Sequence, residues 1–64
     1  MEITLNGEKT QTQHTTLVEL LGEIELPKIF VVEKNGTVIY KESYENINIE
    51  NGDTIEIASF CGGG

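Results

Sequence analysis

The segment FVVEKNGTVIY, residues 30–40, decides the fold. Residues 29–34 form the most apolar run of the chain, and we predict that they are a central strand. Asn35-Gly36 predicts a tight hairpin turn, because Asn and Gly tolerate the positive φ that such turns require. The turn leads into a second strand at 37–40, so the middle of the chain is predicted to be a β-hairpin.

A second hairpin is predicted at the N-terminus. Residues 2–6 alternate, with Ile3 and Leu5 on one face, which is typical of a half-buried strand. Asn6-Gly7 then predicts a turn into a polar strand at 8–13. A strand with so few apolar residues is expected at the edge of the sheet.

A helix is predicted between the two hairpins. Thr16 and Glu19 have the spacing of a capping box, in which each side chain accepts a hydrogen bond from a free N–H at the helix start. Gly22 is the predicted stop. An apolar stripe at helical spacing lies between and beyond these signals: Leu17, Leu20, Leu21 and Ile24.

The C-terminal third contains an irregular stretch at 41–46, a short strand at 47–49, an Asn51-Gly52-Asp53 turn and a last strand at 54–60. The fold class is therefore α+β, with one helix on one face of a mixed sheet of four to five strands. The first and last strands are expected to pair in the centre, which is the β-grasp topology. Residues 1–60 are predicted to be a single domain, and residues 61–64 a flexible glycine tail.

Composition and charge exclude several classes of function. A chain of 64 residues with 38% hydrophobic residues has one small core, and it has no run of the ~20 apolar residues that span a bilayer. Eleven acidic residues against four lysines give a net charge of −7, and there is no arginine. Such a chain repels phosphate backbones, so we expect no nucleic-acid partner. The lack of an apolar span predicts no membrane partner. The acidic residues are expected to be solvated, with a subset facing basic partners.

The inventory of reactive side chains is small. The single cysteine, Cys61, and the single histidine, His14, provide neither a disulfide nor an iron–sulfur or zinc site. His14 is predicted to be a solvated turn residue. The absence of paired cysteines and of a secretory signal indicates a cytoplasmic protein. Because no nucleophile–base pair or paired carboxylate is recognisable, we expect that the chain is not an enzyme.

The informative feature is the end of the sequence, Cys61-Gly62-Gly63-Gly64. Glycines without side chains form a narrow and flexible thread that can enter a tunnel in another protein. The reactive group would then be the α-carboxylate of Gly64. The alternative interpretation is a frayed terminus without a role, since flexible glycines are common at chain ends.

The whole chain resembles the thiamin-pathway sulfur carrier proteins, the ThiS family of ubiquitin-like β-grasp proteins. The resemblance depends on Asn6-Gly7, on FVVEKNG at 30–36, on NGDTIEI at 51–57 and on Phe60 followed by Gly62-Gly63-Gly64. Each of these motifs is weak alone, and their combination is specific.

The resemblance implies a carrier. Gly64 would be adenylated by an E1-like adenylating enzyme of the ThiF type and then converted to a thiocarboxylate, with Gly63 and Gly62 completing the thread in the partner's tunnel. The sulfur would come from a persulfide donor such as a cysteine desulfurase. A thiazole synthase of the ThiG type would take it into the thiazole of thiamin. The chain itself would bind no cofactor or metal, since ATP and Mg²⁺ would belong to the adenylating partner.

Two further expectations concern the residues before the tail. Cys61 is either a small apolar residue or the site of a transient disulfide, and we favour the first because no basic residue is near it in sequence. If Ile55 and Ile57 face the helix, Ala58 and Phe60 face away from it, as Val31 does on its own strand. Val31, Ala58 and Phe60, together with Cys61 and Gly62, are therefore predicted to contact partner proteins. The alternative is that Phe60 packs against Tyr40 or Tyr44.

Three rival functions stay open at the level of sequence. A carrier of the same kind could deliver sulfur to molybdopterin or to another pathway, although such carriers are usually longer. A ubiquitin-like modifier would instead join its tail to target lysines. A plain interaction module would make no use of the glycines.

Overall fold

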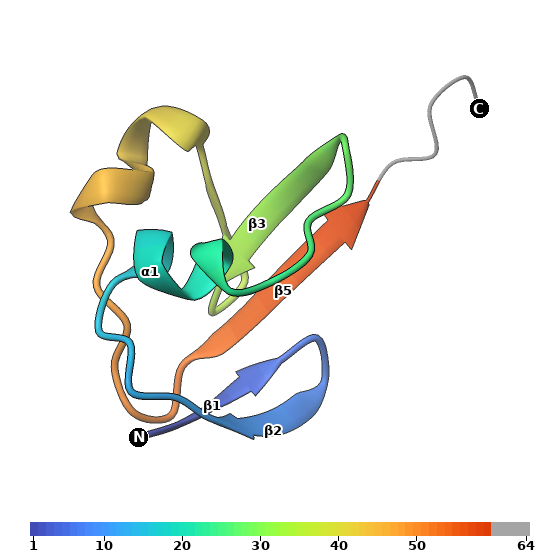
Figure 1. Ribbon diagram of the computed structural model, residues 1–64. Coiled ribbons are helices and arrows are strands. Elements are labelled where there is room, and N and C mark those ends of the chain that lie inside the picture. Colours follow the sequence, from blue (N-terminus) through green and yellow to red (C-terminus); the bar gives the residue numbers. More distant parts are fainter. Residues whose placement is uncertain (60–64) are drawn as a thin grey trace.

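Five strands form one mixed sheet in the computed structural model, which describes residues 1–59 (Figure 1). The strand order is β2-β1-β5-β3-β4. β1 and β5 pair in parallel, and the other neighbours are antiparallel. The elements are β1 (Glu2–Leu5), β2 (Glu8–Gln11), α1 (Leu17–Gly22), β3 (Phe30–Lys34), β4 (Thr37–Ile39), the 3-10 helix η1 (Lys41–Asn46) and β5 (Thr54–Ser59). The predicted β-grasp is confirmed, with β2 at one edge and β5 in the centre.

Three Asn-Gly sequences form the turns, and their asparagines also join neighbouring strands. The hairpin turns place Asn6 at φ 50° and Asn35 at φ 52°, each followed by a glycine of positive φ, as a tight hairpin requires. Each asparagine Oδ1 also accepts a hydrogen bond from a backbone N–H that is distant in sequence. These bonds are Asn6 with Ile57 (2.7 Å), Asn35 with Thr54 (2.8 Å) and Asn51 with Glu2 (2.8 Å).

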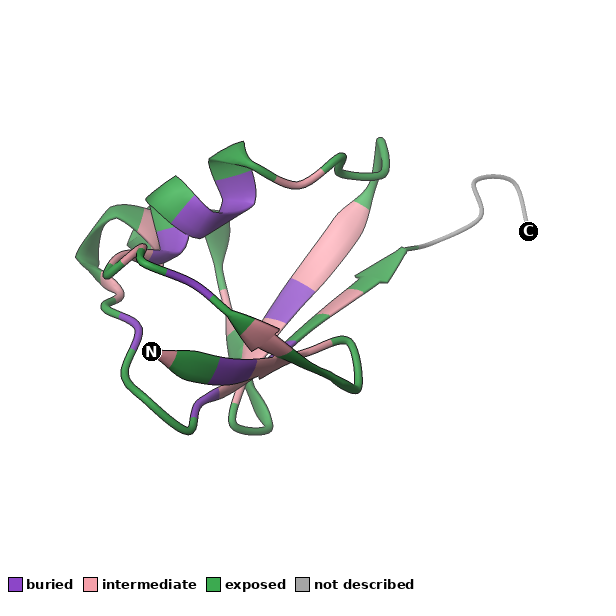
Figure 2. Ribbon diagram, turned by 60° about the horizontal axis from the view of Figure 1, so that its bottom comes forward, coloured by how far each residue is buried: buried purple, intermediate pink, exposed green. Residues whose placement is uncertain are grey.

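The core lies between α1 and the face of the sheet that this helix covers. Figure 2 shows the buried residues of α1 on the side of the helix that faces the strands. Burial of a large apolar side chain of this kind contributes roughly 1.5–3 kcal/mol. The buried hydrophobic residues are Ile3, Leu17, Leu20, Leu21, Val32, Ile49 and Ile55.

The predicted cap at the start of α1 is confirmed, and a further hydrogen bond joins the start of the helix to a distant segment of the chain. Thr16 Oγ1 accepts a hydrogen bond from the Glu19 N–H at 3.2 Å, while the Glu19 carboxylate accepts from the Thr15 N–H at 3.3 Å. The Leu17 N–H donates to the Ile47 carbonyl at 3.0 Å. The predicted strand at 47–49 is therefore no sheet strand: it makes a single bridge, between Thr16 and Asn48, and so fixes the helix start.

The prediction for His14 is wrong. Its side chain is only 28% exposed, and Nε2 lies 2.8 Å from the carboxylate of Glu23, just after α1. Sequence reasoning missed this contact because it depends on how the segment before the helix folds back along it.

Asp53 is the one buried carboxylate among residues 1–59, with 7% of its surface exposed. Its oxygens accept hydrogen bonds from Asn35 Nδ2 at 3.0 Å and from the Glu50 N–H at 2.8 Å, and Lys34 Nζ lies 3.6 Å away. Burial raises the pKa of Asp53, but the bonds from Asn35 and Glu50 and the charge of Lys34 outweigh it and hold the pKa below its ordinary value of 3.8. The charged form of Asp53 thus joins the β3–β4 turn to the turn before β5.

We predict that this carboxylate makes the fold sensitive to acid. Because the pKa of Asp53 is lower in the folded than in the unfolded chain, its contribution to the free energy of unfolding is complete above about pH 5 and is lost as the pH falls through the lowered value. Urea unfolding between pH 7 and pH 3 measures this loss. Asp53→Asn should be less stable at pH 7 and should lose less stability on acidification. An equal loss in the variant and the original chain would contradict the assignment.

Candidate functional site

The face of the sheet that α1 leaves free carries the candidate site. Residues directly opposite one another in an antiparallel pair point to the same face. Val32 is fully buried under α1, so its neighbours Val31 and Glu33 point to the outer face. Val31 lies directly opposite Ala58, and Glu33 lies directly opposite Glu56. The prediction that Val31 and Ala58 face away from the helix is confirmed.

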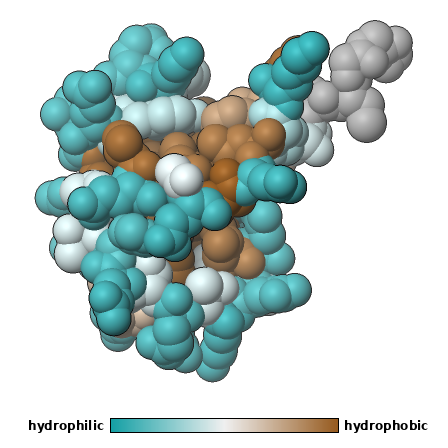
Figure 3. All heavy atoms as spheres, viewed as in Figure 1, coloured by the Kyte–Doolittle hydropathy of each residue, from teal (hydrophilic) through white to brown (hydrophobic). Residues whose placement is uncertain are grey.

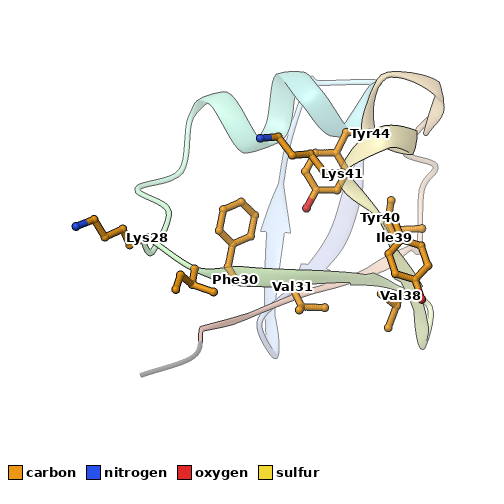
Figure 4. Close-up of a pocket in the computed structure, with 9 residues that line it drawn as sticks. Lys28, Phe30, Val31, Val38, Ile39, Tyr40, Lys41 and Tyr44 are labelled. Carbon is orange, nitrogen blue, oxygen red and sulfur yellow. The ribbon is translucent and has the colours of Figure 1, made fainter. Parts of the chain in front are cut away.

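Apolar side chains gather on this outer face beside the end of β5. Ala58 is exposed and Val31 is half-buried, while Val38 is 41% and Tyr40 69% exposed. In Figure 4, Val31 and Val38 lie on one side of β3, and Phe30 and Tyr44 lie on the other. We call Val31, Val38, Tyr40 and Ala58 the outer-face patch. Because these exposed apolar side chains lie together, the outer face is the candidate surface for association with a partner.

Two carboxylates border the outer-face patch. Glu33 and Glu56 lie opposite one another on adjacent strands, an arrangement in which like charges destabilise a sheet. A pair of residues that lowers the stability of the fold is expected where function requires that pair. The outer face thus has an apolar centre bordered by two negative charges, a pattern that complements a surface with an apolar centre and basic residues around it.

The structure brings together part of the predicted site. It places Val31 and Ala58 side by side, whereas Phe60, Cys61, Gly62, Gly63 and Gly64 lie outside the described residues. It adds Val38 and Tyr40, which the sequence reasoning did not select. The available signal was the alternation of residues 37–40: if Ile39 faces the core, its two neighbours face away.

Within residues 1–59, no three His, Cys, Asp or Glu side chains are grouped so that they could hold a metal ion. Asp53, whose carboxylate has the shifted pKa, is bonded within the turn network described above. No helix in this part of the chain has the length and apolar character to cross a membrane.

The β-grasp sheet and the glycine-rich end of the sequence are together typical of a ubiquitin-like carrier class. Residues 2–64 match the ThiS family, and the chain belongs to this family. It is 40% identical over 63 residues to the sulfur carrier protein ThiS of Bacillus subtilis, covering 94% of this chain and 96% of that protein.

Two further comparisons agree with the family. The chain is 38% identical over 66 residues to a thiazole synthase of Paramagnetospirillum magneticum, and it spans only 20% of that protein's length. Its fold matches the crystal structure of the thiamine biosynthesis protein ThiS from Geobacter metallireducens. That match has a TM-score of 0.85 and 29% identity, and it covers both chains completely.

Proposed function

We propose that this chain is a sulfur carrier of thiamin biosynthesis and that Gly64 carries the sulfur. The observation that carries the proposal is the match to the Bacillus subtilis sulfur carrier protein over 96% of that protein's length. The outer-face patch supports it, because a carrier must be recognised by the enzymes that load and unload it. In this function the chain is a protein substrate and not itself an enzyme.

The chemistry takes place on the carboxylate of Gly64. That carboxylate attacks the α-phosphorus of ATP on an adenylating enzyme, and pyrophosphate leaves. A persulfide sulfur then attacks the acyl carbon of the adenylate, and AMP leaves as a much better leaving group than hydroxide. Reduction of the resulting S–S bond by a thiol leaves a thiocarboxylate on Gly64. We call this conversion sulfur loading. ATP and Mg²⁺ belong to the adenylating enzyme.

The thiazole synthases support the choice of acceptor. Two proteins with this name, from Paramagnetospirillum magneticum and Magnetococcus marinus, each match the whole of this chain within 20% of their own length. A unit like this one is thus part of those proteins, and we infer that a thiazole synthase is the acceptor here. An adenylating enzyme and a persulfide donor such as a cysteine desulfurase complete the proposed set of partners. A single cysteine suits a reducing compartment, so we place the carrier in the cytoplasm.

Intact-mass measurement of a loading reaction tests the proposal. The protein is incubated with the adenylating enzyme of its host, MgATP and a persulfide source. The expected result is a mass gain equal to the exchange of one oxygen for one sulfur, on a mature chain that ends at Gly64. Deletion of Gly64 should abolish this gain without changing the circular dichroism spectrum. A folded protein that gains neither adenylate nor sulfur from an active enzyme would overturn the proposal.

Reversal of the charge of Glu56, which borders the outer-face patch, should raise stability and weaken docking. We predict that Glu56→Lys raises the free energy of unfolding by about 0.5 kcal/mol, because it replaces a like-charge pair with Glu33 by an opposite-charge pair. The same change should slow sulfur loading roughly tenfold at low salt, because it removes attraction to a basic partner. Urea unfolding and the rate of loading measure the two effects. Glu45→Lys, on the exposed surface of η1, is the matched control and should leave the rate of loading unchanged.

A further inference from the structure

One edge of β3 is left without a neighbouring strand. β5 pairs with β3 along its whole length, from Phe30 to Lys34. β4 pairs with β3 only from Val32 to Lys34, since its last residue, Ile39, lies opposite Val32. Beyond this point the chain enters η1, so in the described part of the protein the Phe30 end of β3 has a strand on one side only (Figure 1).

Phe30 directs its backbone groups to this free edge. Asn35 donates its N–H to the Thr54 carbonyl at 2.8 Å, on the side of β5. Backbone N–H and C=O groups alternate in direction along a strand. The backbone groups of the odd-numbered residues of β3 therefore point toward β5, and those of the even-numbered residues point toward β4. The N–H and C=O of Phe30 therefore point to the place where β4 has ended. An unpaired strand edge of this kind is a template for pairing with another chain.

An apolar groove of about 380 Å³ lies along this edge. Phe30 and Tyr44 point into it from the side of α1, whereas Val31 and Val38 border it on the side of the outer-face patch (Figure 4). In Figure 3, apolar residues form a band across the face seen in Figure 1, with hydrophilic residues above and below it. The groove thus offers apolar contacts on both sides of an open strand edge.

The groove is positively charged within an acidic protein. Lys28 and Lys41, two of the four lysines of a chain with net charge −7, line it, and no acidic residue is among the residues that do. A third lysine, Lys34, makes contacts within the protein instead: its Nζ donates a hydrogen bond to the Asn48 carbonyl at 2.8 Å and lies near the carboxylate of Asp53. This distribution complements an acidic ligand and opposes a basic one.

We propose that this groove binds an extended, apolar segment of a partner protein that carries acidic residues at its ends, by strand addition to β3. The main chain of the segment pairs with Phe30. Its side chains alternate between the two sides of the sheet, because successive residues of a strand point to opposite faces. The apolar side chains of the segment contact Phe30 and Tyr44 on one side of the sheet and Val31 and Val38 on the other. The acidic side chains at the two ends of the segment pair with Lys28 and Lys41. This binding does not require sulfur loading.

A synthetic peptide, acetyl-Asp-Glu-Val-Ile-Val-Glu-Asp-amide, is the probe, and amide chemical shifts in NMR spectra are the readout. The expected result is shift changes confined to residues 28–31 and 38–44, with slower hydrogen exchange of the Phe30 amide. A peptide with lysines in place of the acidic residues should bind at least roughly tenfold more weakly, because its positive charges are repelled by Lys28 and Lys41. A peptide with proline in place of the central isoleucine should also bind more weakly, because proline cannot donate a ladder hydrogen bond.

Variants of the protein complete the test. Lys41→Glu should weaken binding of the acidic peptide roughly fivefold at low salt, whereas Lys9→Glu, the same change on β2 outside the groove, should not. The proposal is overturned if the basic or the proline-containing peptide binds as well as the acidic one. It is also overturned if both variants weaken binding equally. Concentration-dependent shifts of residues 28–31 without peptide would instead identify a second copy of this chain as the occupant.

Discussion

Ala58→Glu is expected to slow sulfur loading by about 30- to 100-fold while leaving the domain folded. Ala58 is exposed in the outer-face patch, directly opposite Val31. A carboxylate there would be buried without a partner on docking, which costs about 2–3 kcal/mol. The added negative charge strengthens attraction to a basic partner at long range, so a slower reaction cannot come from lost steering. Initial rates of thiocarboxylate formation, read by intact mass, measure the effect.

A matched change away from the patch serves as the control for this prediction. Gln13 is exposed and lies outside the strands, so Gln13→Glu adds the same charge at a site that should touch no partner. Its rate of loading should stay within about twofold of the original. Equal rates for Ala58→Glu and Gln13→Glu would contradict the assignment of the outer face as the docking surface. Thermal unfolding of both variants checks that the fold is retained.

Leu17→Ala is expected to lower the free energy of unfolding by about 3 kcal/mol. Leu17 has no exposed surface, and it lies in the first turn of α1 where the helix is fastened to Ile47. Truncation removes apolar burial and leaves a cavity between the helix and the sheet. At 0.05–0.15 kcal/mol per residue, a domain of this size has only roughly 3–10 kcal/mol of stability in total. The variant should therefore be partly or largely unfolded at 37 °C, and its Tm should fall on the order of 15 °C.

The neighbouring valine provides the comparison for this substitution. Val18 is 46% exposed on the same turn of α1, so Val18→Ala removes little buried surface and should cost less than about 1 kcal/mol. Urea unfolding followed by circular dichroism measures both variants. A loss of less than about 1 kcal/mol for Leu17→Ala would mean that the helix does not form the core contact described above.

Sequence patterns predicted only part of the outer-face patch. The alternation around Val31 and Ala58 indicates that both face away from the helix, and the register of β3 and β5 then places them opposite one another. The sequence analysis considers Tyr40 only as a packing partner of Phe60, whereas in the structure Tyr40 is 69% exposed. Its position follows from the end of β4 at Ile39 and the turn of the chain into η1.

The sequence alone determined the two hairpins, the helix between them and the face of each strand residue. These depend on contacts between near neighbours, such as the positive φ of Asn35 or the bond from Glu19 to Thr16. The tertiary structure decided which strands become neighbours, how far each pair extends and which polar residues are buried. The free edge at Phe30 and the burial of Asp53 both depend on pairings between distant segments. A local pattern assigns a residue to a face, but only the register across strands selects the residue beside it.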